Sequence, residues 1–284
     1  MSALRNSRSF GFVLITAIYL IAAVGGIWMY SVMPFQWWLN LLLADVAATV
    51  FVYLCSAVFR NASIYDPYWS VQPLVILGAF AVGSPLTVER ALLLAAVFLW
   101  GIRLTVNWAY TFQSLAVQDW RYTMLHEKTG WLYPVVNFLG IHMVPTLVVY
   151  LCTLPAAYAF VYDGEWNFGT IVCAAVSFGA VLLQGIADCQ MHRYRKHRDG
   201  PFIRTGLWMY SRHPNYLGEI LMWWGIAGAV WFLFPQQWGL MAGAVANTLL
   251  FLVVSIPMAD RRQSGKTGFA AYKQQTRMLL PIRK

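Results

Sequence analysis

The sequence predicts an all-α fold: a polytopic membrane helical bundle of seven or eight transmembrane helices. Hydrophobic residues make up 60% of the 284-residue chain, charged residues only 11%, and the mean hydropathy is +0.56. A soluble domain needs a more polar surface than this composition supplies. Apolar segments long enough to cross a hydrocarbon core also recur along the whole chain. Composition and segment length therefore indicate the same class.

Eight apolar segments are candidates for crossing the membrane. In chain order they are 10–32, 36–59, 71–86, 89–110, 135–161, 168–187, 216–235 and 238–257. The third is short and is interrupted by Pro73 and two glycines, so one interpretation is a re-entrant or strongly tilted segment. That segment decides between seven and eight crossings. No long hydrophilic linker interrupts the series, so residues 1–284 are expected to form a single membrane domain.

The distribution of basic residues predicts the orientation. With eight crossings, all twenty Lys and Arg residues except Arg90 and Arg103 fall on the side of the N-terminus or at span ends facing it. The positive-inside rule therefore places both termini and residues 188–215 in the cytoplasm. The protein is expected in a bacterial inner membrane or in the endoplasmic reticulum, as an integral multi-pass protein.

The net charge of +9 does not indicate nucleic-acid binding, because the basic residues flank apolar spans and no soluble nucleic-acid module is visible. Membrane lipid headgroups and a phosphorylated cytoplasmic ligand fit the charge better. No protein partner is predicted. The four cysteines and five histidines lack the spacing of a disulfide framework or a metal site, so no metal is expected.

The most informative stretch is residues 206–219, GLWMYSRHPNYLGE, which leads polar and charged groups directly into an apolar span. Pro214 suits the first turn of a helix, and Asn215 and Glu219 would then share one face, with Tyr216 beside them. A carboxylate at the centre of a membrane costs roughly 2.5–3.5 kcal/mol, so Glu219 is predicted to face a pocket or water. The alternative is an interfacial helix start with a snorkelling carboxylate.

A second polar pattern precedes this stretch. Gln184, Asp188, His192 and Arg195 are spaced four, four and three residues apart, which aligns them on one face of a helix. Arg204 follows closely. Arginine side chains can bind phosphates, and Asp188 can accept hydrogen bonds from ribose hydroxyls, so the cluster suits a nucleotide. No Gly-x-Gly-x-x-Gly fingerprint follows a strand, so this would not be a Rossmann site. A merely solvated helix face is the alternative.

The N-terminal half contains one further candidate, residues 66–69, DPYW, at the predicted cytoplasmic entry to the third apolar segment. Tyr68 can donate a proton or hydrogen bond to a substrate carbonyl. The alternative for Asp66 is a structural ion pair with Arg103, and Asp45 has the same ambiguity between structure and site.

Several motifs resemble the DUF1295 proteins of the steroid 5α-reductase-like superfamily. They are GIAD at 185–188, TGLW at 205–208, SRHPNYLGE at 211–219, WWG at 223–225, and the tail from FAAY at 269–272 to LP at 280–281. The resemblance is strongest over 184–281. SIYD at 63–66 with Trp69, and WGIRL at 100–104, extend it weakly upstream.

The resemblance implies a membrane reductase that binds NADPH from the cytoplasm and transfers a hydride to a carbon–carbon double bond conjugated to a carbonyl. The substrate would be a steroid-like or other lipophilic enone. By position, the cofactor-binding residues would be Asp188, Arg195, Asn215 and Glu219, with Arg204, Tyr210, His213 and Tyr216 as additions. The catalytic candidates are Tyr68, Asp66 and Glu219.

One departure from the superfamily bears on the substrate. Steroid 5α-reductases use a Gln-Glu pair and a Tyr in their N-terminal helices to engage the steroid carbonyl, and this chain has no Gln-Glu pair. Asp66 with Tyr68 is the candidate replacement. A steroid substrate is therefore less firmly implied than the nucleotide.

Two other functions stay open at this point. The Arg-His-Pro region and the C-terminal tail also resemble isoprenylcysteine carboxyl methyltransferases, which bind S-adenosylmethionine. A non-enzymatic membrane lipid-binding or assembly protein is the third possibility. The double Trp after Glu219 and the stripe from Asp188 to Arg195 favour the reductase.

Overall fold

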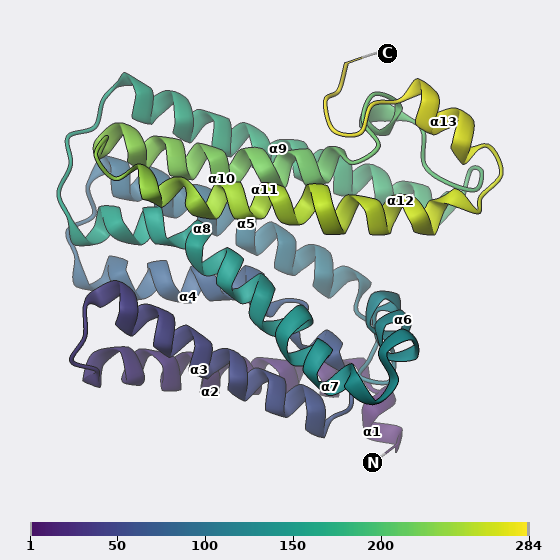
Figure 1. Cartoon of the computed structure of the whole chain (residues 1–284), viewed down its shortest axis with the longest axis horizontal. Helices are drawn as coiled ribbons and strands as arrows, with labels where there is room; N and C mark the ends of the chain where they lie inside the picture. The colour runs from purple at the N-terminus through teal and green to yellow at the C-terminus, as the bar shows by residue number, and fades with distance from the viewer. Residues whose placement is uncertain (1, 283–284) are drawn as a thin grey trace. The chain divides into compact units, whose positions relative to one another are not determined.

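The computed structural model describes residues 2–282 and confirms the all-α class, because these residues form helices and turns but no β-strand (Figure 1). Seven helical segments are long and apolar enough to cross a membrane. They are Arg8–Val32, Trp37–Val58, Val88–Thr111, Trp120–Val161, Phe168–His197, Pro214–Leu233 and Trp238–Ser264. Each corresponds to one of the predicted apolar segments, so the chain is a multi-pass membrane protein by length and composition.

The third predicted segment forms the short helix α4 (Tyr68–Gly83), which has Pro73 in its interior. Its 16 residues give an axial length of about 24 Å, less than the ~30 Å hydrocarbon core of a typical bilayer. This explains why seven rather than eight segments meet the length of a membrane span.

The described chain divides into two compact units. The first consists of the chain up to Pro85 together with Trp100–Ala157, and the second consists of Leu86–Leu99 and the chain from Tyr158 onward. Helices α5 (Val88–Thr111) and α8 (Val144–Val161) contribute to both units. The chain passes from one unit to the other within α5, within α8 and in the loop between Pro85 and Leu86.

The first unit is built mainly from helices α2 to α4. Its elements besides α4, α5 and α8 are α1 (Ser2–Asn6), α2 (Arg8–Val32), α3 (Trp37–Val58), η1 (Ala62–Tyr65), α6 (Trp120–Thr129), η2 (Gly130–Leu132), α7 (Tyr133–Val136) and the π-helical η3 (Asn137–Met143). Helix α2 begins where the Ser7 side chain accepts a hydrogen bond from the amide of Phe10, which satisfies one free N–H of the first turn.

Three chain segments meet at one end of this unit. The Ala116 amide donates to the Arg5 carbonyl over 3.1 Å, and the Asn61 side chain donates to the Leu115 carbonyl over 2.8 Å. The N-terminal segment, the loop before η1 and the segment after α5 thus share one end. The orientation predicted from the basic residues requires this arrangement, since it assigns all three segments to the cytoplasm.

The second unit is organised around the antiparallel helices α9 and α10 (Figure 1). Its elements besides parts of α5 and α8 are α9 (Phe168–His197), η4 (Gly206–Met209), α10 (Pro214–Leu233), η5 (Trp238–Met241), α11 (Ala242–Leu250), the π-helical η6 (Phe251–Ser255), α12 (Ile256–Ser264) and α13 (Phe269–Gln275). A left-handed Arg198 ends α9, which releases the chain toward the segment that leads into α10.

Glycines let α9 and α10 approach closely. A Cβ added at Gly218 would lie 2.8 Å from the carbonyl oxygen of Ala180, and one added at Gly225 would lie 2.7 Å from that of Cys173. The Ser177 hydroxyl also donates to the Met222 carbonyl across this contact, over 3.0 Å. Small residues and interhelical hydrogen bonds are the usual basis of helix association in membranes, so this pair forms the rigid centre of the second unit.

Candidate functional site

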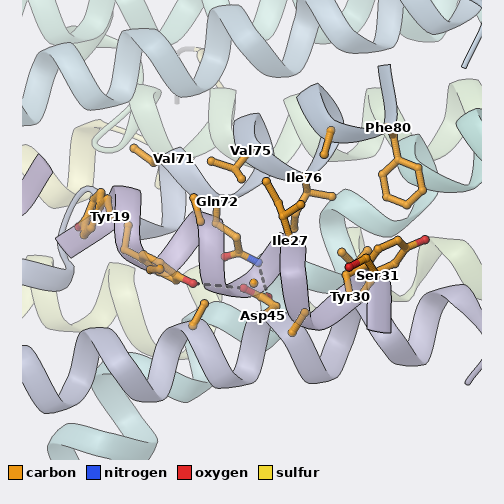
Figure 2. A pocket seen from close by; sticks show the side chains of 18 of the residues that line it. Tyr19, Ile27, Tyr30, Ser31, Asp45, Val71, Gln72, Val75, Ile76 and Phe80 are labelled. Carbon is orange, nitrogen blue, oxygen red and sulfur yellow. Dashed lines mark hydrogen bonds between the residues drawn. The ribbon is translucent and has the colours of Figure 1, made fainter. Parts of the chain in front are cut away.

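The first unit contains an apolar cavity of about 380 Å³ between α2, α3 and α4 (Figure 2). Its volume falls within the range of about 300–1,000 Å³ that is typical of small-molecule sites. Small residues from all three helices form much of its wall, including Ala22, Gly26, Ala44, Ala48 and Ala79. The lack of bulky side chains at these positions leaves the space between the helices open.

A polar cluster lies in the wall of the cavity, between Tyr19 on one side and Tyr30 on the other (Figure 2). The Tyr68 hydroxyl donates to one oxygen of the Asp45 carboxyl group over 3.4 Å, and the Gln72 side-chain amide donates to the other oxygen (Figure 2). All three side chains line the cavity and are at least nine-tenths buried. A polar group buried in apolar surroundings is costly unless hydrogen-bonded, so Asp45 depends on these two donors.

This cluster retains unused hydrogen-bonding capacity. The side-chain oxygen of Gln72, Oε1, is buried and has no hydrogen-bond partner within residues 2–282. The bond from Tyr68 to Asp45 is also long for an O–H donor, since such bonds usually measure 2.5–3.0 Å. A ligand in the cavity can therefore compete for both groups without disrupting a strong internal bond.

Aromatic packing holds Tyr68 in place. Its ring lies 5.5 Å from the ring of Tyr19 and 5.4 Å from that of Tyr65, and the Tyr19 hydroxyl is anchored on the Ile64 carbonyl. Tyr68 thus lies in the cavity, in agreement with a substrate-facing position. Its neighbour Trp69 packs against Trp100 and is not among the residues that line the cavity.

Asp66 does not join this cluster, and the expected pairing of Asp66 with Tyr68 does not form. The Asp66 carboxyl group instead accepts a hydrogen bond from Tyr122, and Arg121 lies 4.0 Å away. Burial raises the pKa of Asp66 to about 6, although Arg121 and the bond from Tyr122 act in the opposite direction. The chain bends at Pro67 between Asp66 and α4, so the acid that faces Tyr68 is Asp45.

In the second unit, the sequence pattern of a polar helix start is confirmed. Helix α10 begins at Pro214, and α9 carries Asp188 and Arg195 on one continuous helix. Arg195 and Arg204 are exposed, while Asp188 is half-buried and lies about two turns before Arg195. Guanidinium groups can donate to phosphates and a carboxylate can accept hydrogen bonds from ribose hydroxyls, so these residue types are chemically suited to a nucleotide.

Asn215, Tyr216 and Tyr210 extend this surface. All three are half-buried, with Asn215 and Tyr216 in the first turn of α10 and Tyr210 just after η4. The Tyr216 ring stacks on the His213 ring, with 5.2 Å between centroids and 3° between planes. The Tyr216 ring also packs against the Phe251 ring, with 4.8 Å between centroids, so the start of α10 is held by aromatic packing.

His213 is buried within an ion-pair cluster that the sequence patterns did not reveal. Its Nε2 lies 3.0 Å from one oxygen of Asp260, and Arg212 lies 3.0 Å from the other oxygen. Lys273 approaches the same carboxyl group at 3.5 Å. Asp260 belongs to α12, so this cluster fastens α12 to the start of α10.

The C-terminal segment completes the same cluster. Arg212 donates from its side chain to the Thr276 carbonyl over 2.6 Å and from its amide to the Arg277 carbonyl over 3.0 Å. The Tyr272 hydroxyl donates to the Trp208 carbonyl, and burial raises the pKa of Tyr272 to about 12. Residues far apart in sequence are thereby joined around Arg212, which leaves it no role as an exposed phosphate ligand.

Glu219 is buried at the contact of α9 and α10. Its two carboxyl oxygens accept hydrogen bonds from the Gln184 side chain over 2.7 Å and from the Trp223 indole over 3.0 Å. The sequence predicted that Glu219 faces a pocket or water, whereas in the structure its carboxyl group is buried between α9 and α10 and bonds to protein side chains. The Gln184 amide also donates to the Asn215 carbonyl over 3.5 Å. Glu219 therefore holds Gln184 in place, and Gln184 in turn contacts the backbone at Asn215.

Comparison with known proteins identifies the family. The model of a family described as "Protein of unknown function (DUF1295)" matches residues 52–276, most of the chain. The chain belongs to the DUF1295 family. This family is part of the steroid 5α-reductase-like superfamily, which confirms the resemblance seen in the motifs.

A related protein shows how much of the chain is shared outside the family model. The DUF1295 protein described here is 26% identical over 222 residues to an uncharacterized protein of Schizosaccharomyces pombe, covering 68% of this chain and 64% of that relative. No solved structure matches the chain. The DUF1295 range includes Tyr68, Gln72 and the whole α9–α10 pair, while Asp45 precedes it.

Proposed function

We propose that this DUF1295 protein is a membrane-embedded, NADPH-dependent reductase of lipophilic enones. The observation that carries the proposal is the cluster of Asp45, Gln72 and Tyr68 in the wall of an apolar cavity. It combines an acid, an amide and a phenol from two helices, which is the set of groups that steroid 5α-reductases supply with a Gln-Glu pair and a Tyr. Membership of that superfamily supports the same reading.

The cluster is suited to polarise a carbonyl group. Turning the Tyr68 hydroxyl away from its long bond to Asp45 gives the ligand an O–H donor. Rotation of the Gln72 side-chain amide about its last torsion turns an N–H group toward the cavity. The amide oxygen can then accept a hydrogen bond from a protonated Asp45. Two donors would then converge on one carbonyl oxygen, where they stabilise the negative charge of a developing enolate.

The overall reaction balances as enone, NADPH and one proton giving saturated ketone and NADP⁺. When bound, NADPH would supply the hydride, with its two electrons, to the β-carbon of the enone. Tyr68 and Gln72 would hold the negative charge that collects on the carbonyl oxygen, and the one proton of the overall reaction would bond to the α-carbon. The apolar walls of the cavity would exclude water from the site.

The second unit supplies the residues assigned to NADPH. Arg195 and Arg204 would pair with phosphates, Asp188 would accept from ribose hydroxyls, and the stacked His213 and Tyr216 would support the position of the nucleotide. Glu219 would act as a positioning residue through Gln184. If Arg195 grips the 2′-phosphate, Arg195→Ala should weaken NADPH far more than NADH, and equal losses would reject that role.

Titration of the purified full-length protein with NADPH and, separately, with S-adenosylmethionine tests the nucleotide. We expect saturable binding of NADPH, reduced in the double variant Arg195→Ala, Arg204→Ala, and no binding of S-adenosylmethionine. Tight binding of S-adenosylmethionine alone would favour a methyltransferase and overturn the reductase. Binding of neither nucleotide would favour a lipid-binding or assembly protein.

A further inference from the structure

Helix α3 carries a line of buried polar side chains that begins at the cavity. Asp45, Thr49 and Ser56 follow one another at spacings of four and seven residues, so they lie on one face of α3, and all three are buried. The line extends over about 16 Å of helix. Ser56 lies two residues before α3 ends at Val58, at the end that the basic residues predict to face the cytoplasm.

A chain of hydroxyl groups connects this face of α3 to Tyr68 in the cavity. Thr49 is a hydrogen-bond partner of the Tyr68 side chain. The Thr49 hydroxyl lies 3.1 Å from the hydroxyl of Thr146 on α8, which in turn lies 2.8 Å from the hydroxyl of Tyr65. A hydroxyl can donate one hydrogen bond and accept others at the same time. All four groups can therefore donate in one direction, from Tyr65 toward Tyr68.

His142 lies beside the far end of this chain, in the π-helical η3, and is fully buried. Its ring packs against the Tyr65 ring with 4.6 Å between centroids. Its Nδ1 lies 3.0 Å from the Asn137 carbonyl, and its Nε2 lies 3.2 Å from the Ser56 hydroxyl. An ionisable side chain inside a membrane bundle usually marks a functional position, and π-helical turns often occur at such positions.

The partners of His142 satisfy both the neutral and the protonated imidazole. In the neutral ring, Nδ1–H donates to the Asn137 carbonyl while Nε2 accepts from the Ser56 hydroxyl. In the protonated ring both nitrogens donate, and the Ser56 hydroxyl donates instead to the Tyr53 carbonyl, which lies 2.8 Å away. Rotation of one hydroxyl thus separates the two states. His142 can therefore take up and release a proton without leaving either ring nitrogen unpaired.

We propose that the proton consumed in the reaction reaches the cavity along this route, from His142 through Tyr65, Thr146 and Thr49 to Tyr68. The inference rests on the proposed function, whose overall reaction takes up one proton. Each hydroxyl passes its proton to the next group and receives one from the group before it. The net change is one proton lost by the His142 imidazolium and one gained by the reduced substrate.

The step from His142 to Tyr65 requires a movement. Among the residues that the structure describes, these two side chains share a ring contact and no hydrogen bond. Rotation of the imidazole has to bring a ring nitrogen to the Tyr65 hydroxyl before the proton passes. The imidazole then returns to Ser56, at the predicted cytoplasmic end of α3, to take up the next proton.

Loss of one hydroxyl in the middle of the route tests it. Thr146→Val removes the hydroxyl while keeping the size and branching of the side chain, and Thr146→Ser keeps the hydroxyl. Tyr65→Phe breaks the same hydrogen bond from the other side, so the test does not depend on one variant. The control is Thr153→Val, because Thr153 is equally buried on α8 but its hydroxyl donates to the Val149 carbonyl of its own helix.

Turnover of a steroid 4-en-3-one probe with NADPH would be measured in H₂O and in D₂O, with full-length protein in lipid nanodiscs. We expect Thr146→Val and Tyr65→Phe to lower turnover at least about tenfold and to raise the solvent isotope effect, because proton delivery becomes rate-limiting. The dissociation constants of the probe and of NADPH should not change. Thr146→Ser should behave like wild type. His142→Gln, which cannot carry a proton at neutral pH, should behave like Thr146→Val.

The outcomes separate this inference from the proposed function. If Thr146→Val and Tyr65→Phe match Thr153→Val in turnover and in solvent isotope effect, the route is wrong, although reduction of the probe by wild type would still support the proposed function. Full turnover in His142→Gln would also overturn the route as stated. If wild type forms no saturated ketone, the proposed function is wrong and the route is overturned with it.

Discussion

The cavity of the first unit and the polar helix start of the second unit use buried polar groups in opposite ways. In the cavity, Asp45 has two donors, but the buried Gln72 Oε1 has no protein partner among residues 2–282. Around the start of α10, one oxygen of Asp260 pairs with Arg212 and the other with His213, and only the Nε of Arg212 is left without a partner among the described residues of this cluster. The open acceptor in the cavity is available to a ligand, whereas the paired carboxyl group of Asp260 holds segments of the fold together.

This difference changes how the Arg-His-Pro stretch is interpreted. It is the most conspicuous motif in the sequence, yet its buried members, Arg212 and His213, bond to Asp260 and to the C-terminal segment. In the proposed function, the phosphates of the nucleotide are therefore assigned to the exposed Arg195 and Arg204 and not to Arg212. We therefore expect substitutions in the two regions to have distinct effects, on turnover in the cavity and on stability at the helix start.

The largest effect is expected in the cavity. Tyr68→Phe removes the phenolic donor while keeping the ring packed against Tyr19 and Tyr65. A positioned acid or donor typically contributes 10²–10⁴-fold to rate, so turnover of an enone probe should fall by at least about 100-fold. Thermal stability and NADPH affinity should stay close to wild type. Full turnover in Tyr68→Phe would remove Tyr68 from the mechanism.

The next largest effect is expected at the helix start. Asp260→Asn removes the charge that Arg212 and His213 share, and leaving one side of a buried pair uncompensated costs about 3–5 kcal/mol. Thermal unfolding in detergent should shift to clearly lower temperature. The control is Asp163→Asn, whose 95% exposed carboxylate contacts the buried Arg90 at 2.7 Å; because Arg90 keeps its bond to the Ala159 carbonyl, this variant should lose less stability than Asp260→Asn. Equal shifts in both variants would mean that the Asp260 cluster does not stabilise the fold.

A smaller effect is expected at the contact of α9 and α10. Gly225→Ala places a methyl group 2.7 Å from the Cys173 carbonyl oxygen, and such overpacking typically costs about 1–3 kcal/mol. Gly179→Ala in α9 is the control, because an added Cβ there meets no atom within 4 Å. It should be neutral or slightly stabilising, since alanine favours the helix. Stability would be compared by thermal unfolding, and an unchanged Gly225→Ala would contradict the close approach of the two helices.

The smallest effect concerns pH and Asp66. Its pKa is about 6 in the folded protein and about 3.9 in an unfolded chain, so between these values the folded state binds more protons. Stability should therefore fall as the pH rises from 4 to 6, most steeply near pH 5, by about 1 kcal/mol per pH unit. Asp66→Asn should flatten this dependence. The same slope in wild type and variant would show that another group causes it.

Local sequence patterns predicted much of the fold, because the length of an apolar segment and the residues that begin a helix can be read from neighbouring positions in the chain. The start of α10 at Pro214 and the continuous α9 stripe from Asp188 to Arg195 are examples. The partners of polar groups could not be obtained in this way. Asp45 meets Gln72 only when α3 packs against α4, and Asp260 meets His213 only when α12 packs against α10, so both pairings depend on tertiary contacts.

Transfer of a labelled hydride tests the central claim most directly. Full-length protein in lipid nanodiscs would be incubated with a 4-en-3-one probe and NADPH that carries deuterium at carbon 4 of the nicotinamide, using each epimer in turn. The account predicts that one epimer yields a saturated ketone with a single deuterium at the β-carbon, and that Tyr68→Phe greatly slows its formation. Recovery of unchanged enone with both epimers, from protein that binds S-adenosylmethionine, would contradict it.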